Sequence, residues 1–128
     1  MRFDSKGSEM IRHFCRNIYQ SDENFTLDEL RNYNIKVVID VCDKEKFATV
    51  NDLPVKYFHI PLADCQPIPE WIIDFVKTIN ENVLVHCCAG LSRSVRVCQL
   101  VCGMTEEQAR SIVPNSLGCV QSQPIKKV

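Results

Sequence analysis

The twelve residues from 83 to 94, VLVHCCAGLSRS, constrain this chain more than any other stretch. An apolar run typical of a buried strand leads into Cys87, and Arg93 follows six positions later. The five residues between them are mostly small, so the backbone there can curl into a loop. A thiol and a guanidinium on the same loop predict a pocket for a tetrahedral dianion.

Backbone amides at the start of a helix would serve this pocket in two ways. They stabilise a thiolate, which matters because a free thiol with a pKa near ~8.5 is mostly protonated at neutral pH. They also bind phosphate oxygens, while the planar fork of an arginine grips two oxygens at once. The predicted phosphate-binding residues are Cys88, Ala89, Gly90, Leu91, Ser92 and Arg93, with Gly90 permitting the tight bend.

The expected chemistry is nucleophilic catalysis by a cysteine. Cys87 would attack phosphorus to form a cysteinyl phosphate, with positioning and electrostatics stabilising the transition state. Ser94 would offer its hydroxyl to the sulfur and make it a better leaving group in the second step. His86 is either an orienting residue beneath the loop or a core histidine with local hydrogen bonds, and both readings stay open.

Composition sets the class of protein. The 128 residues are 45% hydrophobic and 24% charged with a net charge of −1, as expected for one soluble globular domain over 1–128 with loose ends at 1–10 and 115–128. No apolar run reaches the ~18 residues of a membrane span, and the N-terminus lacks a signal-peptide core. Neither a nucleic-acid partner nor a membrane is expected.

Eight cysteines are many for this length, and an even number would suit a disulfide framework. However, Cys15, Cys42, Cys98 and Cys102 lie in apolar segments, where reduced cysteines act as small core residues. No Cys-x2-Cys pair is present to begin a zinc site, so no metal or cofactor is expected. We therefore predict mainly reduced thiols and a cytoplasmic or other reducing intracellular location.

Periodicity predicts strands that alternate with helices. The expected strands are 35–42, 55–60 and 83–85, and the expected helices are 27–33, about 69–79, 94–102 and 105–113. Two capping boxes, at 26–29 and 105–108, mark helix starts, and Pro69 fits a first helical position. Residues 11–19 suit either a helix or a short edge strand. This order predicts an α/β fold, a central, mostly parallel sheet flanked by helices.

The motif His86-Cys87-x5-Arg93-Ser94, after an apolar strand, resembles the signature of the cysteine-based protein tyrosine phosphatases. The ending AGLSRS is similar to the dual-specificity branch in particular. The resemblance extends over roughly residues 15–115. It implies a protein-tyrosine-phosphatase-like fold without a metal and a two-step hydrolysis of phosphate monoesters.

The resemblance also implies a general acid on a loop before the cysteine. Asp64 in the sequence PLAD is the best match, and it would protonate the leaving oxygen and then help to activate water. A turn-forming aspartate is the plain alternative. Glu70 and Asp74 are rivals for the role, but both fall in the following helix. Only 22 residues separate Asp64 from Cys87, which is short for the family.

No phosphotyrosine-recognition loop is visible, and the 88–92 loop carries no basic side chain. A shallow, neutral pocket is expected, which would admit phosphotyrosine and phosphoserine or phosphothreonine of a phosphoprotein partner. The alternatives are a phosphate-binding module without turnover, a phosphatase for a lipid or RNA end, and a rhodanese- or Cdc25-like reaction on another fold. The oligomeric state is left open.

Two further cysteines raise a redox hypothesis. Cys42 ends a strand at the position where some lipid-phosphatase relatives hold a second thiol, and Cys88 is the neighbour of Cys87 in sequence. Either would protect an oxidised Cys87 by forming a disulfide with it. The plain alternative is that both thiols only pack in the core.

Overall fold

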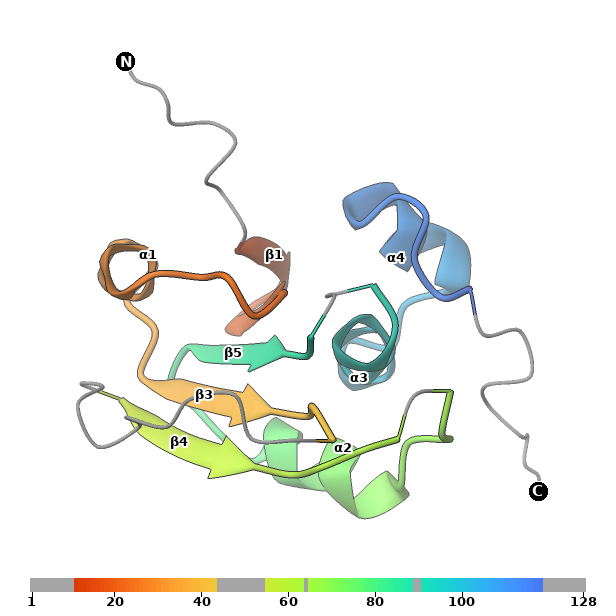
Figure 1. Cartoon of the computed structure of the whole chain (residues 1–128), viewed down its shortest axis with the longest axis horizontal. Helices are drawn as coiled ribbons and strands as arrows, with labels where there is room; N and C mark the ends of the chain where they lie inside the picture. The colour runs from red at the N-terminus through yellow and green to blue at the C-terminus, as the bar shows by residue number, and fades with distance from the viewer. Residues whose placement is uncertain (1–10, 44–54, 64, 89–90, 119–128) are drawn as a thin grey trace.

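The computed structural model describes residues 11–43, 55–63, 65–88 and 91–118 of the chain. The strands are β1 (Arg12–Cys15), β2 (Ile18–Ser21), β3 (Val37–Asp40), β4 (Lys56–His59) and β5 (Val83–His86). The helices are α1 (Leu27–Asn32), α2 (Glu70–Lys77), α3 (Arg93–Val101) and α4 (Glu106–Ile112). The predicted α/β fold, a mostly parallel sheet flanked by helices, is confirmed (Figure 1).

The five strands form one sheet in the order β1-β2-β5-β3-β4. β2, β5, β3 and β4 run parallel, and β1 pairs antiparallel with β2 at one edge. All four residues of β3 and of β5 are buried, which explains why both strands are apolar up to their last residues, Asp40 and His86. The strand that leads to Cys87 is therefore the middle strand of the sheet.

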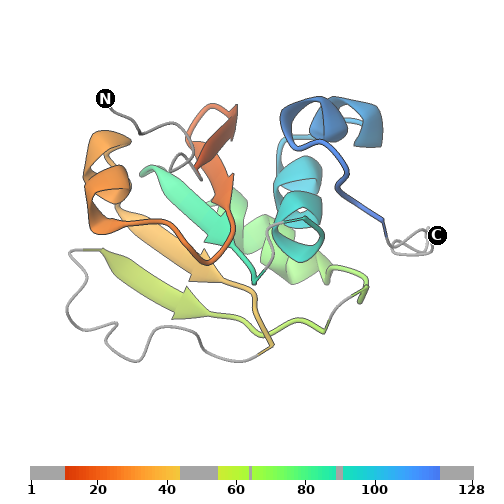
Figure 2. The ribbon, with the colours of Figure 1, turned by 45° about the horizontal axis from the view of Figure 1, so that its top comes forward.

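Side-chain alternation along the strands divides the core into two layers. On one face, Val38 and Leu84 pack with Leu30 of α1. On the other face, Val37, Ile39, Val83 and Val85 pack with residues of α2 and α3, among them Ile72, Val76, Val95 and Val97. Figure 2 shows α1 on one side of the sheet and the other helices opposite. Because α3 belongs to the larger layer, its first residues, Arg93 and Ser94, are buried in the fold.

The helix ends follow the predicted signals closely. Thr26 and Thr105 each accept a hydrogen bond from the backbone N–H three residues later, and both capping boxes are complete. Gly103 follows α3 with φ +65°, the left-handed conformation that glycine adopts without strain. Pro69 is the N-cap of α2 and not its first helical residue.

Residues 11–19, for which the sequence allowed either a helix or a short edge strand, are part of a β-hairpin. β1 and β2 are joined by a turn at Arg16 and Asn17, and Arg16 has a φ of 39°. The strand conformation prevails because β2 pairs with β5 along its whole length, an interaction that a helix there would lose. β2 thereby becomes a direct neighbour of the strand that leads to Cys87.

The prediction that Cys15 and Cys102 are reduced core residues is wrong. They form a disulfide between the end of β1 and the residue after α3, with Cα atoms 6.1 Å apart. Cys65 is also disulfide-bonded. Within the described part of the chain, Cys42, Cys87, Cys88 and Cys98 are free thiols. Sequence spacing could not reveal the pair because 87 positions separate its members.

The structure describes only residues 115–118 of the two end segments that were predicted to be loose. Residues 1–10 and 119–128 lie outside the described residues. In the segment after α4, Ser116 and Leu117 are buried, and Arg110 donates hydrogen bonds to both of their carbonyl groups. The segment predicted to be loose from residue 115 thus contains two buried residues. Among the described residues, no helix is long and apolar enough to span a membrane.

Candidate active site

The carboxyl ends of the parallel strands meet at one edge of the sheet, where open α/β folds bind their ligands. Ser21, His86 and Asp40 lie side by side at this edge, paired in register across β2, β5 and β3. One or two residues further along, the chain reaches Cys87 on one strand and Cys42 on the other. The predicted nucleophile is thus placed where the topology favours a ligand site.

Cys87 lies at the N-terminus of α3. Its side chain is 1% exposed, and its Sγ accepts a hydrogen bond from the backbone N–H of Ser94 at 3.4 Å. The Ser94 hydroxyl lies 3.2 Å from the same sulfur. Ser92, the N-cap, gives no side-chain cap, so the Cys87 sulfur takes a place that a capping oxygen often fills. An anion at this sulfur would be stabilised by the helix dipole.

Arg93 joins this helix start to two loops. Its Nη1 donates to the carbonyl of Leu62 at 2.9 Å and lies 3.4 Å from Oδ1 of Asp43. The guanidinium is therefore buried beside the loop that leads toward Asp64. Asp64 itself lies outside the described residues, as do Ala89 and Gly90 of the predicted phosphate loop. Asp43 was not found by sequence reasoning, since it follows β3 and matches no motif.

His86 is completely buried beneath Cys87. Its Nε2 lies 3.8 Å from Oδ1 of Asp40, and its ring meets the ring of Phe25 edge-on. Burial lowers the pKa of His86, and the nearby Asp40 opposes this shift only in part. The ring is therefore neutral at physiological pH. Asp40 also accepts hydrogen bonds from the Cys42 N–H and from the Tyr57 hydroxyl, so it anchors the end of β3.

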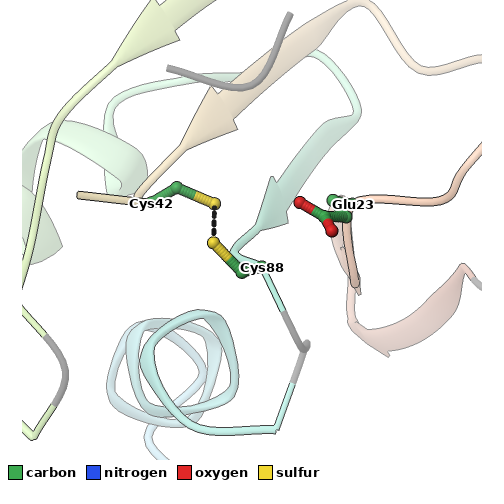
Figure 3. Close-up of side chains that lie close together, drawn as sticks. All are labelled: Glu23, Cys42 and Cys88. Carbon is green, nitrogen blue, oxygen red and sulfur yellow. Dashed lines mark hydrogen bonds between the residues drawn. The ribbon is translucent and has the colours of Figure 1, made fainter. Parts of the chain in front are cut away.

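The two redox candidates contact one another. The Cys88 thiol donates a hydrogen bond to the Cys42 sulfur at 3.0 Å, and Glu23 lies beside them (Figure 3). Burial, followed by the hydrogen bond to Cys88, raises the pKa of Cys42. Two thiolates on one zinc ion lie about 3.7 Å apart, because each Zn–S bond is ~2.3 Å. The described geometry is thus that of a hydrogen-bonded thiol pair, and the expectation of no metal stays a prediction.

The segment after α4 closes the outer side of the site. Leu117 donates its backbone N–H to the carbonyl of Leu91 in the phosphate loop at 2.8 Å. A small cavity next to Arg93 is lined by Cys65, Gln66, Ile68, Ser92, Arg96 and Leu117. Nη1 of Arg96 forms an ion pair with Oε2 of Glu106 at 2.7 Å. The contact of Leu117 with Leu91 could not be predicted from the sequence, because residues 115–118 carry no periodic pattern.

The site also contains a glutamine that sequence analysis did not select. Gln20 of β2 is buried, and its Nε2 donates to the Ser94 hydroxyl oxygen at 2.8 Å. A single glutamine in an apolar segment gives no signal in the sequence. Only the pairing of β2 with β5 brings it next to the start of α3.

Comparison with known proteins agrees with this geometry. The family model described as "Dual specificity phosphatase, catalytic domain" matches residues 18–101. Human dual specificity protein phosphatase 6 is 37% identical over 83 residues, which cover 59% of this chain and 22% of that protein. The Drosophila melanogaster protein phosphatase Mpk3 is 39% identical over 80 residues, 55% of this chain and 19% of that protein. This chain thus spans about a fifth of the length of these relatives.

A solved structure with the same fold is Tk-PTP in the active form. It superposes with a TM-score of 0.69 at 16% identity and covers 89% of this chain and 93% of its own. This likeness, at such low identity, concerns the fold.

Proposed function

Because this chain belongs to the dual specificity phosphatase catalytic domain family, we propose that it hydrolyses phosphate monoesters on proteins through a cysteinyl-phosphate intermediate. One observation carries the proposal. The Cys87 sulfur lies at the N-terminus of α3, where it accepts the Ser94 N–H. The Arg93 guanidinium belongs to the same helix start. A nucleophile, a backbone donor and a guanidinium are thus supplied at one helix start, which supports a phosphate site there.

In the first step, the Cys87 thiolate attacks phosphorus in line and forms an S–P bond as the P–O bond to the leaving group breaks. Asp64 gives its proton to the leaving oxygen, so an alcohol or phenol departs. Arg93 and the loop amides hold the phosphoryl oxygens. The hydrogen bond from Arg93 to the Leu62 carbonyl supports this assignment, because it couples the arginine to the loop that precedes Asp64.

In the second step, water attacks phosphorus and Asp64 takes its proton. The S–P bond breaks, inorganic phosphate leaves, and Cys87 departs as a thiolate. The Ser94 hydroxyl, 3.2 Å from the sulfur, donates to the thiolate as its charge develops. Ser94 thus assists the departure of sulfur rather than its attack.

The proposed substrates are phosphotyrosine and phosphoserine or phosphothreonine residues of a phosphoprotein. Neutral side chains at Cys88, Leu91 and Ser92 support this reading, because a lipid or RNA phosphate would favour added positive charge. Phosphate binding without turnover is the second candidate. It is suggested by the short loops, since only 22 residues separate Asp64 from Cys87.

Hydrolysis of p-nitrophenyl phosphate by wild type and by Cys87→Ser tests the proposal. We expect turnover by the wild type and none above background by Cys87→Ser. Cys98→Ser is the matched control, since the Cys98 thiol is also buried but contacts the Tyr19 carbonyl. Binding of phosphate without any Cys87-dependent turnover would support the second candidate. A panel of phosphotyrosyl, phosphoseryl and phosphothreonyl peptides and non-protein phosphates then defines the substrate.

A further inference from the structure

Gln20 has an unusual position for a neutral polar side chain. It lies in β2, is 0% exposed, and is paired with Val85 two residues before Cys87. Its amide nitrogen donates to the Ser94 hydroxyl oxygen at 2.8 Å and to the Ser21 carbonyl at 3.3 Å. A buried amide that contacts the partner of the nucleophile needs an explanation beyond packing.

The amide of Gln20 is held in one orientation. Arg12 of β1 donates from Nη1 to Oε1 of Gln20 at 3.3 Å. A guanidinium has only donors, so it must face the carbonyl oxygen of the amide and not the nitrogen. The nitrogen of the same amide is consequently directed toward Ser94.

This orientation decides where the Ser94 proton points. A serine hydroxyl has one donor and two acceptor positions. Gln20 occupies an acceptor position of the hydroxyl, and the Cys87 sulfur lies 3.2 Å from the same oxygen. The single proton is therefore free to point at sulfur. An amide turned the other way would present its oxygen and draw that proton away from Cys87.

We propose that Gln20, oriented by Arg12, is a positioning residue that directs the Ser94 hydroxyl proton toward the Cys87 sulfur. The inference rests on the proposed function, because it concerns the step in which sulfur leaves phosphorus. It assigns a role to β2, a strand outside the motif at 86–94. Gln20 touches neither substrate nor phosphorus and acts only through Ser94.

Two substitutions separate this role from packing. Gln20→Met keeps the length of the side chain but removes the donor. Gln20→Glu keeps a carbonyl-type partner for Arg12 but offers only acceptors to Ser94. With p-nitrophenyl phosphate, we expect kcat to fall about 5–10-fold in Gln20→Met, on the scale of one hydrogen bond, and at least as much in Gln20→Glu. The ratio kcat/KM, which reports formation of the intermediate, should fall less than about threefold.

Rapid mixing gives the more specific readout. Both variants should release p-nitrophenolate in a burst close to one equivalent, followed by slow turnover, because the intermediate then accumulates. In a Ser94→Ala background, Gln20→Met should change kcat less than about twofold, since its target is gone. Equal losses in kcat and kcat/KM, or full additivity with Ser94→Ala, would overturn the proposal.

Gln99 provides a matched control. It is a buried glutamine of α3 whose Oε1 accepts from Arg96 and whose Nε2 donates to the Met104 carbonyl, so its bonding imitates that of Gln20. Gln99→Met should lower thermal stability without producing a burst. A burst of the same size in Gln99→Met would mean that any damage to the core has this effect.

A measurement that needs no turnover keeps the two proposals distinguishable. The rate at which iodoacetamide alkylates Cys87 at pH 7, followed by mass spectrometry of its peptide, should fall about two- to threefold in Gln20→Met and stay unchanged in Gln99→Met. If wild type has no phosphatase activity but shows this pattern, only the proposed function fails. Equal alkylation rates in wild type and Gln20→Met would overturn the inference on Gln20.

Discussion

Cys87 has neighbours that are remote from it in sequence. Its sulfur contacts Ser94 seven positions later, and Ser94 in turn contacts Gln20, 74 positions earlier. Arg93 reaches back 31 positions to the Leu62 carbonyl. The chemistry at this one residue therefore depends on how three segments are held together.

Asp64→Asn tests the general acid at the residue scale. Removing the proton donor should lower kcat by roughly 10²–10⁴ and abolish one limb of the pH profile, because the leaving oxygen would then depart unprotonated. Phenyl phosphate is the substrate of choice, since phenol is a poor leaving group. Asp74→Asn, at an exposed position on α2, is the matched control and should keep the wild-type rate. An unchanged kcat in Asp64→Asn would move the role to another residue.

His86 predicts how stability depends on pH. Burial lowers its pKa in the folded protein below the ordinary value of 6.5. Below about pH 6.5 the unfolded chain binds a proton that the native chain refuses, so the free energy of unfolding should decrease as pH falls, by up to about 1.4 kcal/mol per pH unit. Above that pH this contribution is constant.

Urea unfolding at pH 7.5 and at several values down to pH 5 measures the slope. His86→Gln should be less dependent on pH over this range than wild type, although it is less stable at pH 7.5. Identical slopes in the two proteins would contradict the assignment of the effect to His86.

At the scale of elements, the ends of β3 and β5 place two thiols together. Cys42 follows β3, Cys88 follows β5, and these strands are neighbours in register. Their sulfur atoms are hydrogen-bonded at 3.0 Å, so the redox hypothesis becomes a disulfide between Cys42 and Cys88 in place of one with Cys87. Such a bond would join the phosphate loop to the end of β3.

We expect mild hydrogen peroxide to form this disulfide. Peroxide would oxidise the partly exposed Cys88 thiol to a sulfenic acid, with release of water. The Cys42 sulfur would then attack the Cys88 sulfur, and the S–O bond would break as a second water leaves and the S–S bond forms. Activity should fall with formation of the disulfide and return with dithiothreitol. Mass spectrometry of the peptides measures the bond directly.

Cys42→Ser and Cys98→Ser complete the experiment. In Cys42→Ser, dithiothreitol should restore only part of the activity, because Cys88 and Cys87 would be oxidised beyond the sulfenic acid. Cys98→Ser should behave as wild type, since the Cys98 thiol is buried and contacts the Tyr19 carbonyl. Detection of a disulfide at Cys87 with none between Cys42 and Cys88 would reject this pairing.

At the scale of the whole molecule, the Cys15–Cys102 disulfide joins the edge of the sheet to the end of α3. It closes a loop with a sequence separation of 87, and thus restricts the unfolded chain strongly. We expect the double variant Cys15→Ala/Cys102→Ala to lose about 2–4 kcal/mol of unfolding free energy, measured by urea denaturation. Cys88→Ser, which alters a free and partly exposed thiol, is the control and should lose less than about 1 kcal/mol.

The disulfide can also be tested without substitution. Alkylation of the unreduced protein in denaturant, followed by mass spectrometry, should leave Cys15 and Cys102 unmodified. Full alkylation of both residues would show that the bond is absent. The same digest reports the state of the thiols at Cys42, Cys87, Cys88 and Cys98.

Features that depend on neighbours along the chain could be predicted from the amino-acid sequence. Three kinds of local pattern were visible: the mostly apolar runs at 35–42 and 83–85, the capping boxes at Thr26 and Thr105, and the order of Cys87, Arg93 and Ser94. Strand and helix formation, capping and the strand–loop–helix motif are short-range effects, which explains why the α/β fold and the family could be predicted.

Features that depend on contacts between distant segments became visible in the folded chain alone. The pairing of β2 with β5 turned an ambiguous segment into a strand and brought Gln20 to Ser94. The packing of β1 against the end of α3 joined Cys15 to Cys102. A buried polar residue or a cysteine carries the same local signal whether or not it meets a partner, so these pairs cannot be read from composition or spacing. Their positions follow from the closure of the whole sheet and its helices.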